Sequence, residues 1–196
     1  MNIGFLASHR GSNLQAVVAA VANGVLPVKP VVLVANNRQA EVVGRAQQQG
    51  IPTHVLNAVT HPDPDALDQA VLAALTQHGC DVIVLAGFMK KLGPRVLRAF
   101  HGRIINLHPS LLPRHGGQGM FGRHVHQAVL DARETVTGVT IHLVTEKYDE
   151  GRVLAQCEVP VVPGDTVETL AARVLEREHS FLVETLAAIA AGKLPL

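Results

Sequence analysis

The chain has 196 residues, of which 47% are hydrophobic, 17% charged and 3% aromatic. A chain of this length and composition can bury its own core, which predicts one globular domain covering residues 1–196. The formal net charge of +1 excludes the broad basic field with which proteins bind nucleic acids or acidic membranes. No apolar run is long enough to span a membrane, no signal region precedes the first apolar run, and two cysteines are too few for a disulfide framework. We therefore expect a cytoplasmic protein.

The first half of the chain alternates short apolar runs with segments of helical periodicity. Strands are predicted at residues 2–7, 30–35, 51–56, 81–86 and 103–107, with helices between them at about 14–23, 40–49, 65–78 and from 94 onward. The runs at 30–35 and 81–86 lack polar alternation, which is typical of strands covered on both faces. This order predicts an α/β fold, a doubly wound, mostly parallel sheet with helices on both faces.

The second half of the chain follows a different pattern. Residues 108–123 show no periodicity and are interrupted by prolines and glycines, which predicts a long loop of the kind that is usually functional. A helix is predicted at about 124–132, followed by two late antiparallel strands, at 136–144 and 152–162, joined by a turn at 148–151. The first of these strands alternates, which predicts one solvated face. A long final helix is predicted with Asp165 as its cap.

The segment from His9 to Asn13 joins the first strand to the first helix. A helix N-terminus favours an anion through its unpaired N–H groups and its dipole, and Gly11 permits close approach of the backbone. The segment carries neither the Gly-Lys-Ser/Thr of a P-loop nor the three glycines of the dinucleotide fingerprint. It also fits an ordinary turn with Ser12 as a helix cap, so both interpretations stay open.

Two polar residues stand at alternate positions at the end of the fifth strand, Asn106 and His108, so we expect their side chains on one face. A carboxamide N–H beside an imidazole that can carry a proton near neutral pH suits an oxyanion. Alone, this spacing also fits a histidine at the edge of the core. Asp149, in the turn at 148–151, fits either a plain turn residue or a carboxylate whose charge raises the pKa of His108.

Five blocks occur in a fixed order along the chain, at residues 11–15, 86–89, 105–113, 137–142 and 149–151. Together they resemble the glycinamide ribonucleotide formyltransferases, folate-dependent enzymes of purine synthesis, over residues 2–193. The block Ile-Asn-Leu-His-Pro-Ser-Leu-Leu-Pro at 105–113 and the later aspartate belong to the wider superfamily of formyltransferases and formyl-folate hydrolases. The Gly-Ser-Asn block at 11–13 points to a ribonucleotide substrate within it.

The resemblance implies a phosphoribosyl-binding half, residues 1–100, and a folate-binding and catalytic half, residues 101–196. The reaction it implies is transfer of the formyl group of 10-formyltetrahydrofolate, as co-substrate, to the amine of 5'-phosphoribosylglycinamide. It also implies a cis bond between Leu112 and Pro113. The implied catalytic residues are Asn106, His108 and Asp149; the substrate-binding residues are Gly11, Ser12, Asn13, Leu14, Gln15 and Glu178; and the folate-binding residues are Met89, Lys90, Lys91, Leu92, Asn106 and Val144.

The chain departs from the family pattern in two places. The family usually carries an arginine in the segment before its third helix, near the folate, and residues 60–65 contain none. Residues 115–123 form a longer and more glycine-rich loop than the commonest form, which predicts a more mobile loop that closes differently over its substrates.

Three other functions would use related features. A formyltetrahydrofolate hydrolase would use the same catalytic residues with water in place of the amine, although that class usually carries an extra N-terminal regulatory domain. A methionyl-tRNA formyltransferase resembles only the middle of the chain and needs a basic RNA-binding domain. A non-catalytic nucleotide sensor would tolerate loss of the catalytic residues. The eleven histidines lack the spacing of known metal sites, so we expect no metal, small molecules as partners, and a monomer or homodimer.

Overall fold

In the computed structural model, which describes all 196 residues, seven strands form one sheet in the order β3-β2-β1-β4-β5-β6-β7. β1 runs parallel to β2 and β4, β2 runs parallel to β3, and β6 runs antiparallel to β7. This arrangement confirms the predicted doubly wound sheet with late antiparallel strands. The strands are β1 (Asn2–Ala7), β2 (Lys29–Ala35), β3 (Thr53–Val55), β4 (Val82–Leu85), β5 (Ile104–His108), β6 (Val136–Leu143) and β7 (Val153–Pro160).

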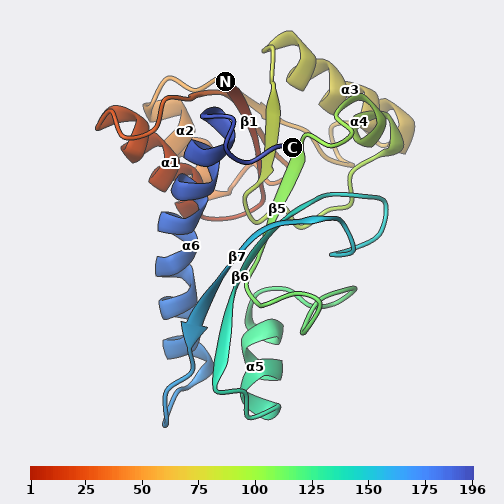
Figure 1. Cartoon of the computed structure of the whole chain (residues 1–196). Coiled ribbons are helices and arrows are strands. Elements are labelled where there is room, and N and C mark those ends of the chain that lie inside the picture. Colours follow the sequence, from red (N-terminus) through yellow and green to blue (C-terminus); the bar gives the residue numbers. More distant parts are fainter. The chain divides into compact units, whose positions relative to one another are not determined.

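The chain divides into two compact units, residues 1–105 and 106–196, with the division inside β5. In the first unit, α1 and α2 lie on one side of the strands and α3 and α4 on the other (Figure 1). β4 is buried along its whole length and β2 over its last five residues, as expected for strands covered on both faces. The helices are α1 (Ser12–Ala22), α2 (Glu41–Gln48), α3 (Pro64–Gln77), α4 (Pro94–Ala99), α5 (Arg123–Asp131) and α6 (Val167–Ala190).

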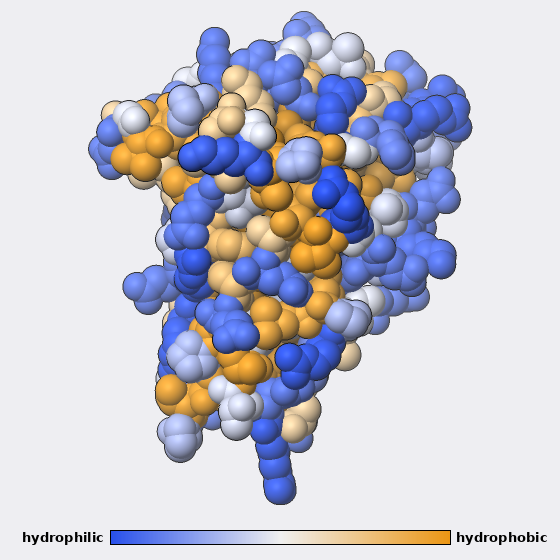
Figure 2. Space-filling model, viewed as in Figure 1, coloured by the Kyte–Doolittle hydropathy of each residue, from blue (hydrophilic) through white to orange (hydrophobic).

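In the second unit, α6 packs against α5 and against the hairpin of β6 and β7. Figure 2 shows hydrophobic residues over this hairpin, whereas the visible side of α6 is mostly hydrophilic. The prediction that β6 has one solvated face is wrong, because its six central residues, 137–142, are all buried. The polar side chains of this strand are therefore inside the protein, where each needs a partner. None of the helices combines the length and apolarity that crossing a membrane requires.

Two helices begin at slightly different residues from those predicted. α3 is capped by Asp63, whose side chain accepts from the N–H groups of Asp65 and Ala66, and Pro64 occupies the first helical position. α6 is capped by Thr166 in a reciprocal capping box rather than by Asp165. Asp165, the residue before this cap, instead forms an ion pair with Arg173.

Replacing Gly44 with alanine is expected to stabilise the protein by about 1 kcal/mol. Gly44 lies in the interior of α2, and a Cβ atom added to it meets nothing within 4 Å. Alanine would therefore lower the conformational entropy of the unfolded chain without a clash in the folded one. Urea unfolding would show a higher midpoint at an unchanged slope, and a lower midpoint would contradict this expectation.

Candidate active site

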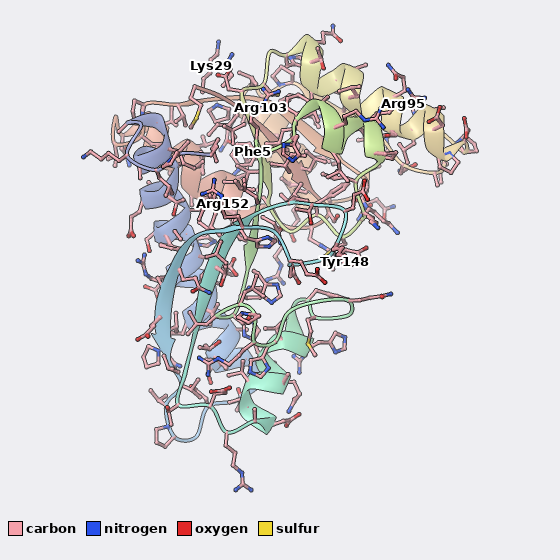
Figure 3. The ribbon with its side chains drawn as sticks, turned by 45° about the vertical axis from the view of Figure 1, so that its right-hand side comes forward. Phe5, Lys29, Arg95, Arg103, Tyr148 and Arg152 are labelled. Atoms are coloured by element: carbon pink, nitrogen blue, oxygen red, sulfur yellow. The ribbon has the colours of Figure 1, made fainter.

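β5 and the loop between β6 and β7 position the predicted catalytic side chains. Asn106 and His108 are two residues apart near the end of β5 and share a face of the strand. Asp149 lies in the loop that joins β6 to β7, and its backbone adopts a left-handed conformation with φ of 56°. In Figure 3, Tyr148 marks this loop and Arg152 lies where the loop enters β7. All three predicted catalytic residues belong to the unit of residues 106–196.

His108 is 3% exposed, and both nitrogens of its imidazole face acceptors. Nδ1 lies 3.4 Å from Asp149 Oδ2, and Nε2 lies 2.7 Å from the carbonyl oxygen of His115. A neutral ring carries one N–H, so only the imidazolium can donate to both. Burial nevertheless lowers the pKa of His108, although the charge of Asp149 and the His115 carbonyl act to raise it. Asp149 therefore acts on this pKa in the predicted direction, but desolvation outweighs the carboxylate.

The carboxylate of Asp149 is held in its ionised form. Burial acts to raise its pKa, but the neighbouring His142 ring, a hydrogen bond from the backbone N–H of Gly117 and the charge of His108 lower it below its usual range. The Gly117 nitrogen lies 2.9 Å from Asp149 Oδ2. The two groups that contact His108 and Asp149 from the glycine-rich loop are thus backbone groups, the His115 carbonyl and the Gly117 N–H.

A fourth polar residue, His142, joins this cluster, and sequence reasoning did not assign it to the site. It lies on β6 and is 2% exposed. Its Nε2 atom lies 3.2 Å from Asn106 Nδ2 and 3.4 Å from Asp149 Oδ1. Asn106, His108 and Asp149 therefore lie together. Asp149 lies between the imidazoles of His108 and His142, and Asn106 contacts the His142 ring.

The start of the loop after β5 is fixed to the hairpin of β6 and β7. Thr140 Oγ1 donates to the Ser110 carbonyl at 2.6 Å and accepts from the Leu112 N–H at 3.0 Å. Gln156 donates to the Leu112 carbonyl at 2.9 Å. The Leu112–Pro113 bond is cis, as predicted. Side chains of β6 and β7, in addition to the prolines, hold the loop backbone beside the catalytic cluster.

The predicted phosphate site lies in the first unit, at the start of α1. Gly11 is the N-cap of this helix, with φ of 69°, and no side chain caps it, so the interpretation of Ser12 as a cap is wrong. A Cβ atom at Gly11 would lie 2.1 Å from Val42 Cγ2, so both the backbone conformation and the contact require glycine. The helical ladder begins with the Gln15 N–H donating to the Gly11 carbonyl. Gln15 therefore has its backbone N–H engaged in the helix.

Ser8 joins this loop to the predicted folate-binding segment, residues 89–92. Its hydroxyl accepts from the Met89 N–H at 2.8 Å, and its own N–H donates to the Gly87 carbonyl at 3.2 Å. Met89 is partly exposed and Leu92 is buried, so Met89 presents more side-chain surface to a ligand than Leu92 does. Sequence reasoning missed Ser8, because a serine before a turn has no distinctive pattern.

Comparisons with known proteins place the chain in a family. The family model described as formyl transferase matches residues 1–186. The phosphoribosylglycinamide formyltransferase of Escherichia coli (strain K12) is 35% identical over 100% of this chain and 90% of its own length. The chloroplastic enzyme of that name from Arabidopsis thaliana is 39% identical over 91% of this chain, which spans 62% of that relative. The chain belongs to the formyl transferase family.

Solved structures agree with this membership of the formyl transferase family. Glycinamide ribonucleotide transformylase 1 from Symbiobacterium toebii has a TM-score of 0.92 at 35% identity, covering 100% of this chain and 90% of that one. A formyltetrahydrofolate deformylase from Pseudomonas syringae has a TM-score of 0.86 at 23% identity, covering 97% of this chain and 61% of that one. The second likeness concerns the fold alone.

A guanidinium lies beside the segment that lacks the arginine usual in the formyltransferases. Arg95, at the start of α4, donates to Asp65 of α3 at 3.1 and 2.7 Å (Figure 3). The Arg95 side chain is 46% exposed, so the pair adds little to stability and the guanidinium remains accessible to solvent.

The other residues predicted to bind ligands lie on different elements of the second unit. Val144 follows the last residue of β6, and Glu178 lies on α6 beside β7, where its charge acts on Cys157. A groove of about 290 Å³ between β7 and α6 contains none of the predicted site residues. Its arginines, Arg173 and Arg177, are already paired with carboxylates. The groove is lined by Glu158, Val159, Pro160, Arg173, Glu176, Arg177 and Ser180.

The buried histidines predict that acid weakens the fold. Burial lowers the pKa of His108 and of His126, and the charge of His108 further opposes protonation of His126. Below the unfolded value of 6.5 the unfolded chain binds more protons than the folded one, so the free energy of unfolding falls as the pH falls. Urea unfolding on both sides of pH 6.5 measures this slope. The variant His126→Gln should show a shallower slope, and an equal slope would contradict the account.

Proposed function

We propose that this chain is a phosphoribosylglycinamide formyltransferase, which transfers the formyl group of 10-formyltetrahydrofolate to the amine of 5'-phosphoribosylglycinamide. The observation that carries the proposal is the cluster of Asn106, His108 and Asp149, in a member of the formyl transferase family. The relatives that are 35–39% identical over nearly the whole chain bear that enzyme's name. The deformylase shares the fold at 23% identity.

In the proposed reaction the nucleotide amine attacks the formyl carbon, and negative charge develops on the formyl oxygen. An N–H of Asn106 and the protonated ring of His108 donate hydrogen bonds to that oxygen. His108 Nε2 already donates to a carbonyl oxygen, that of His115, so the formyl oxygen would replace an acceptor of the same kind. The new negative charge adds to that of Asp149 and favours the imidazolium that burial opposes.

Asp149 has two roles in the proposed reaction. Its charge stabilises protonated His108, and a water beside it carries the proton from the attacking amine to the leaving nitrogen of the folate. No covalent intermediate with the protein is needed. The amide groups at 11–14 would bind the phosphoribosyl group, Glu178 the ribose, and Val144 with residues 89–92 the pteridine ring. The small-molecule partners, the cytoplasmic location, the monomer or homodimer and the absence of a metal stay predictions.

A folate assay separates the proposal from its alternatives. The protein is mixed with 10-formyltetrahydrofolate, with and without 5'-phosphoribosylglycinamide, and tetrahydrofolate release is measured. Release that requires the nucleotide supports formyl transfer. Release without it supports a hydrolase, and no release in either mixture supports a non-catalytic binding protein.

The variant Asn106→Ala is expected to lower kcat by about 10²–10³-fold, because it removes one donor to the developing oxyanion. Asn106 is partly buried, and its Nδ2 atom contacts His142, so the loss of packing is small and local. Steady-state kinetics with both substrates measures the effect. A kcat within a few fold of the wild-type value would remove Asn106 from the proposed mechanism.

A further inference from the structure

His142 lies where two of the proposed catalytic residues meet. It is on β6, the strand whose polar side chains are buried, and its side chain is 3% exposed. The same nitrogen, Nε2, lies 3.2 Å from Asn106 Nδ2 and 3.4 Å from Asp149 Oδ1. A buried imidazole in this place must make hydrogen bonds to its neighbours, since water does not reach it.

The second nitrogen of the ring determines what Nε2 can do. Nδ1 lies 2.9 Å from the carbonyl oxygen of Leu143, an acceptor, so the ring proton belongs on Nδ1. In the neutral ring Nε2 then presents a lone pair, and the Asn106 Nδ2 group donates one of its two N–H bonds to it. The bond to His142 therefore sets which way the Asn106 carboxamide faces and leaves its other N–H for a ligand.

Asp149 lies beside the same ring but is held by other groups. Its Oδ1 atom lies 3.4 Å from His142 Nε2, which in the neutral ring has no proton to donate to a carboxylate. Its Oδ2 atom lies beside His108 and accepts from the Gly117 N–H. The role of His142 therefore concerns Asn106 rather than Asp149.

We propose that His142 is a positioning residue, which accepts a hydrogen bond from Asn106 and so orients the Asn106 carboxamide without itself touching the substrates. The inference rests on the formyl transfer proposed above. Displacements of about 1 Å in a catalytic group can cost about 10²-fold in rate, so loss of the His142 ring should act on kcat more than on KM.

Three variants test the role of His142. His142→Leu is expected to lower kcat by about 10–10²-fold, with the KM of each substrate changed by less than about threefold. His142→Gln should recover most of that loss, because its carboxamide oxygen can accept from Asn106. Thr137→Val, at a buried polar position of the same strand, is the matched control and should keep the wild-type kcat.

A double-mutant cycle with Asn106→Ala separates positioning from mere packing. If His142 acts through Asn106, the loss caused by His142→Leu should shrink to a few fold in the Asn106→Ala background. An equal loss in both backgrounds, or wild-type kcat in His142→Leu, would overturn the inference. If His142→Leu does not fold, as judged by circular dichroism, the same cycle is measured with His142→Phe, which keeps a ring but offers Asn106 no acceptor. Failure of the wild-type protein to transfer the formyl group would instead overturn the proposed function.

Discussion

Replacing His108 with alanine is expected to lower kcat by more than about 10³-fold, the largest single effect in the proposed mechanism. The variant removes a charge-assisted donor rather than a neutral one, and such hydrogen bonds are about twice as strong. It also leaves Asp149, which is ionised and poorly exposed, without one of its two imidazole partners. Steady-state and single-turnover kinetics with both substrates would measure the loss.

The control for this prediction is His101→Ala, which removes an exposed histidine and should leave kcat unchanged. Thermal unfolding would establish that His108→Ala is folded before its kcat is compared. Wild-type kcat in a folded His108→Ala protein would exclude the imidazolium as the oxyanion donor.

Changing Asp149 to asparagine is expected to lower kcat by about 10³-fold or more, although the size of the side chain is preserved. The asparagine oxygen can still accept from the Gly117 N–H, so the loop contact at 2.9 Å is retained. The negative charge is lost, however, and burial then acts on His108 with no carboxylate to oppose it. The fraction of protonated His108, and with it the charge-assisted hydrogen bond, should fall.

The neighbouring carboxylate provides the control for Asp149. Glu150 lies in the same loop, its side chain is 63% exposed, and it pairs with Lys147. Glu150→Gln removes the same charge from the same loop and should keep kcat within about twofold, because exposed pairs contribute little. Equal losses in Asp149→Asn and Glu150→Gln would mean that the field of the loop, rather than contact with His108, controls the reaction.

Much of the catalytic cluster could be predicted from the sequence because it follows from strand geometry. Asn106 and His108 share a face since they are two residues apart in a strand, and that spacing is visible in the sequence. Asp149 and the cis bond at Leu112–Pro113 were expected through the resemblance to the family rather than from spacing. The doubly wound sheet was likewise predictable from the alternation of apolar runs with helical periods.

The remaining parts of the cluster depend on tertiary burial, which a local pattern does not show. His142 stands at an alternating position that predicts a solvated face, yet all the central residues of β6 are buried. The contacts from His115 and Gly117 are made by backbone groups, which have no side-chain signature. The direction in which the pKa of His108 shifts depends on whether desolvation outweighs the charge of Asp149. The sequence shows neither the burial of His108 nor its distance from Asp149.

The most direct test of the proposed function follows the formyl group itself. The protein is incubated with 10-formyltetrahydrofolate carrying a ¹³C-labelled formyl group and with 5'-phosphoribosylglycinamide, and the products are analysed by mass spectrometry. The account predicts that the label appears on the nucleotide amine in the same amount as the tetrahydrofolate released. Label recovered as free formate, with the nucleotide unmodified, would contradict it.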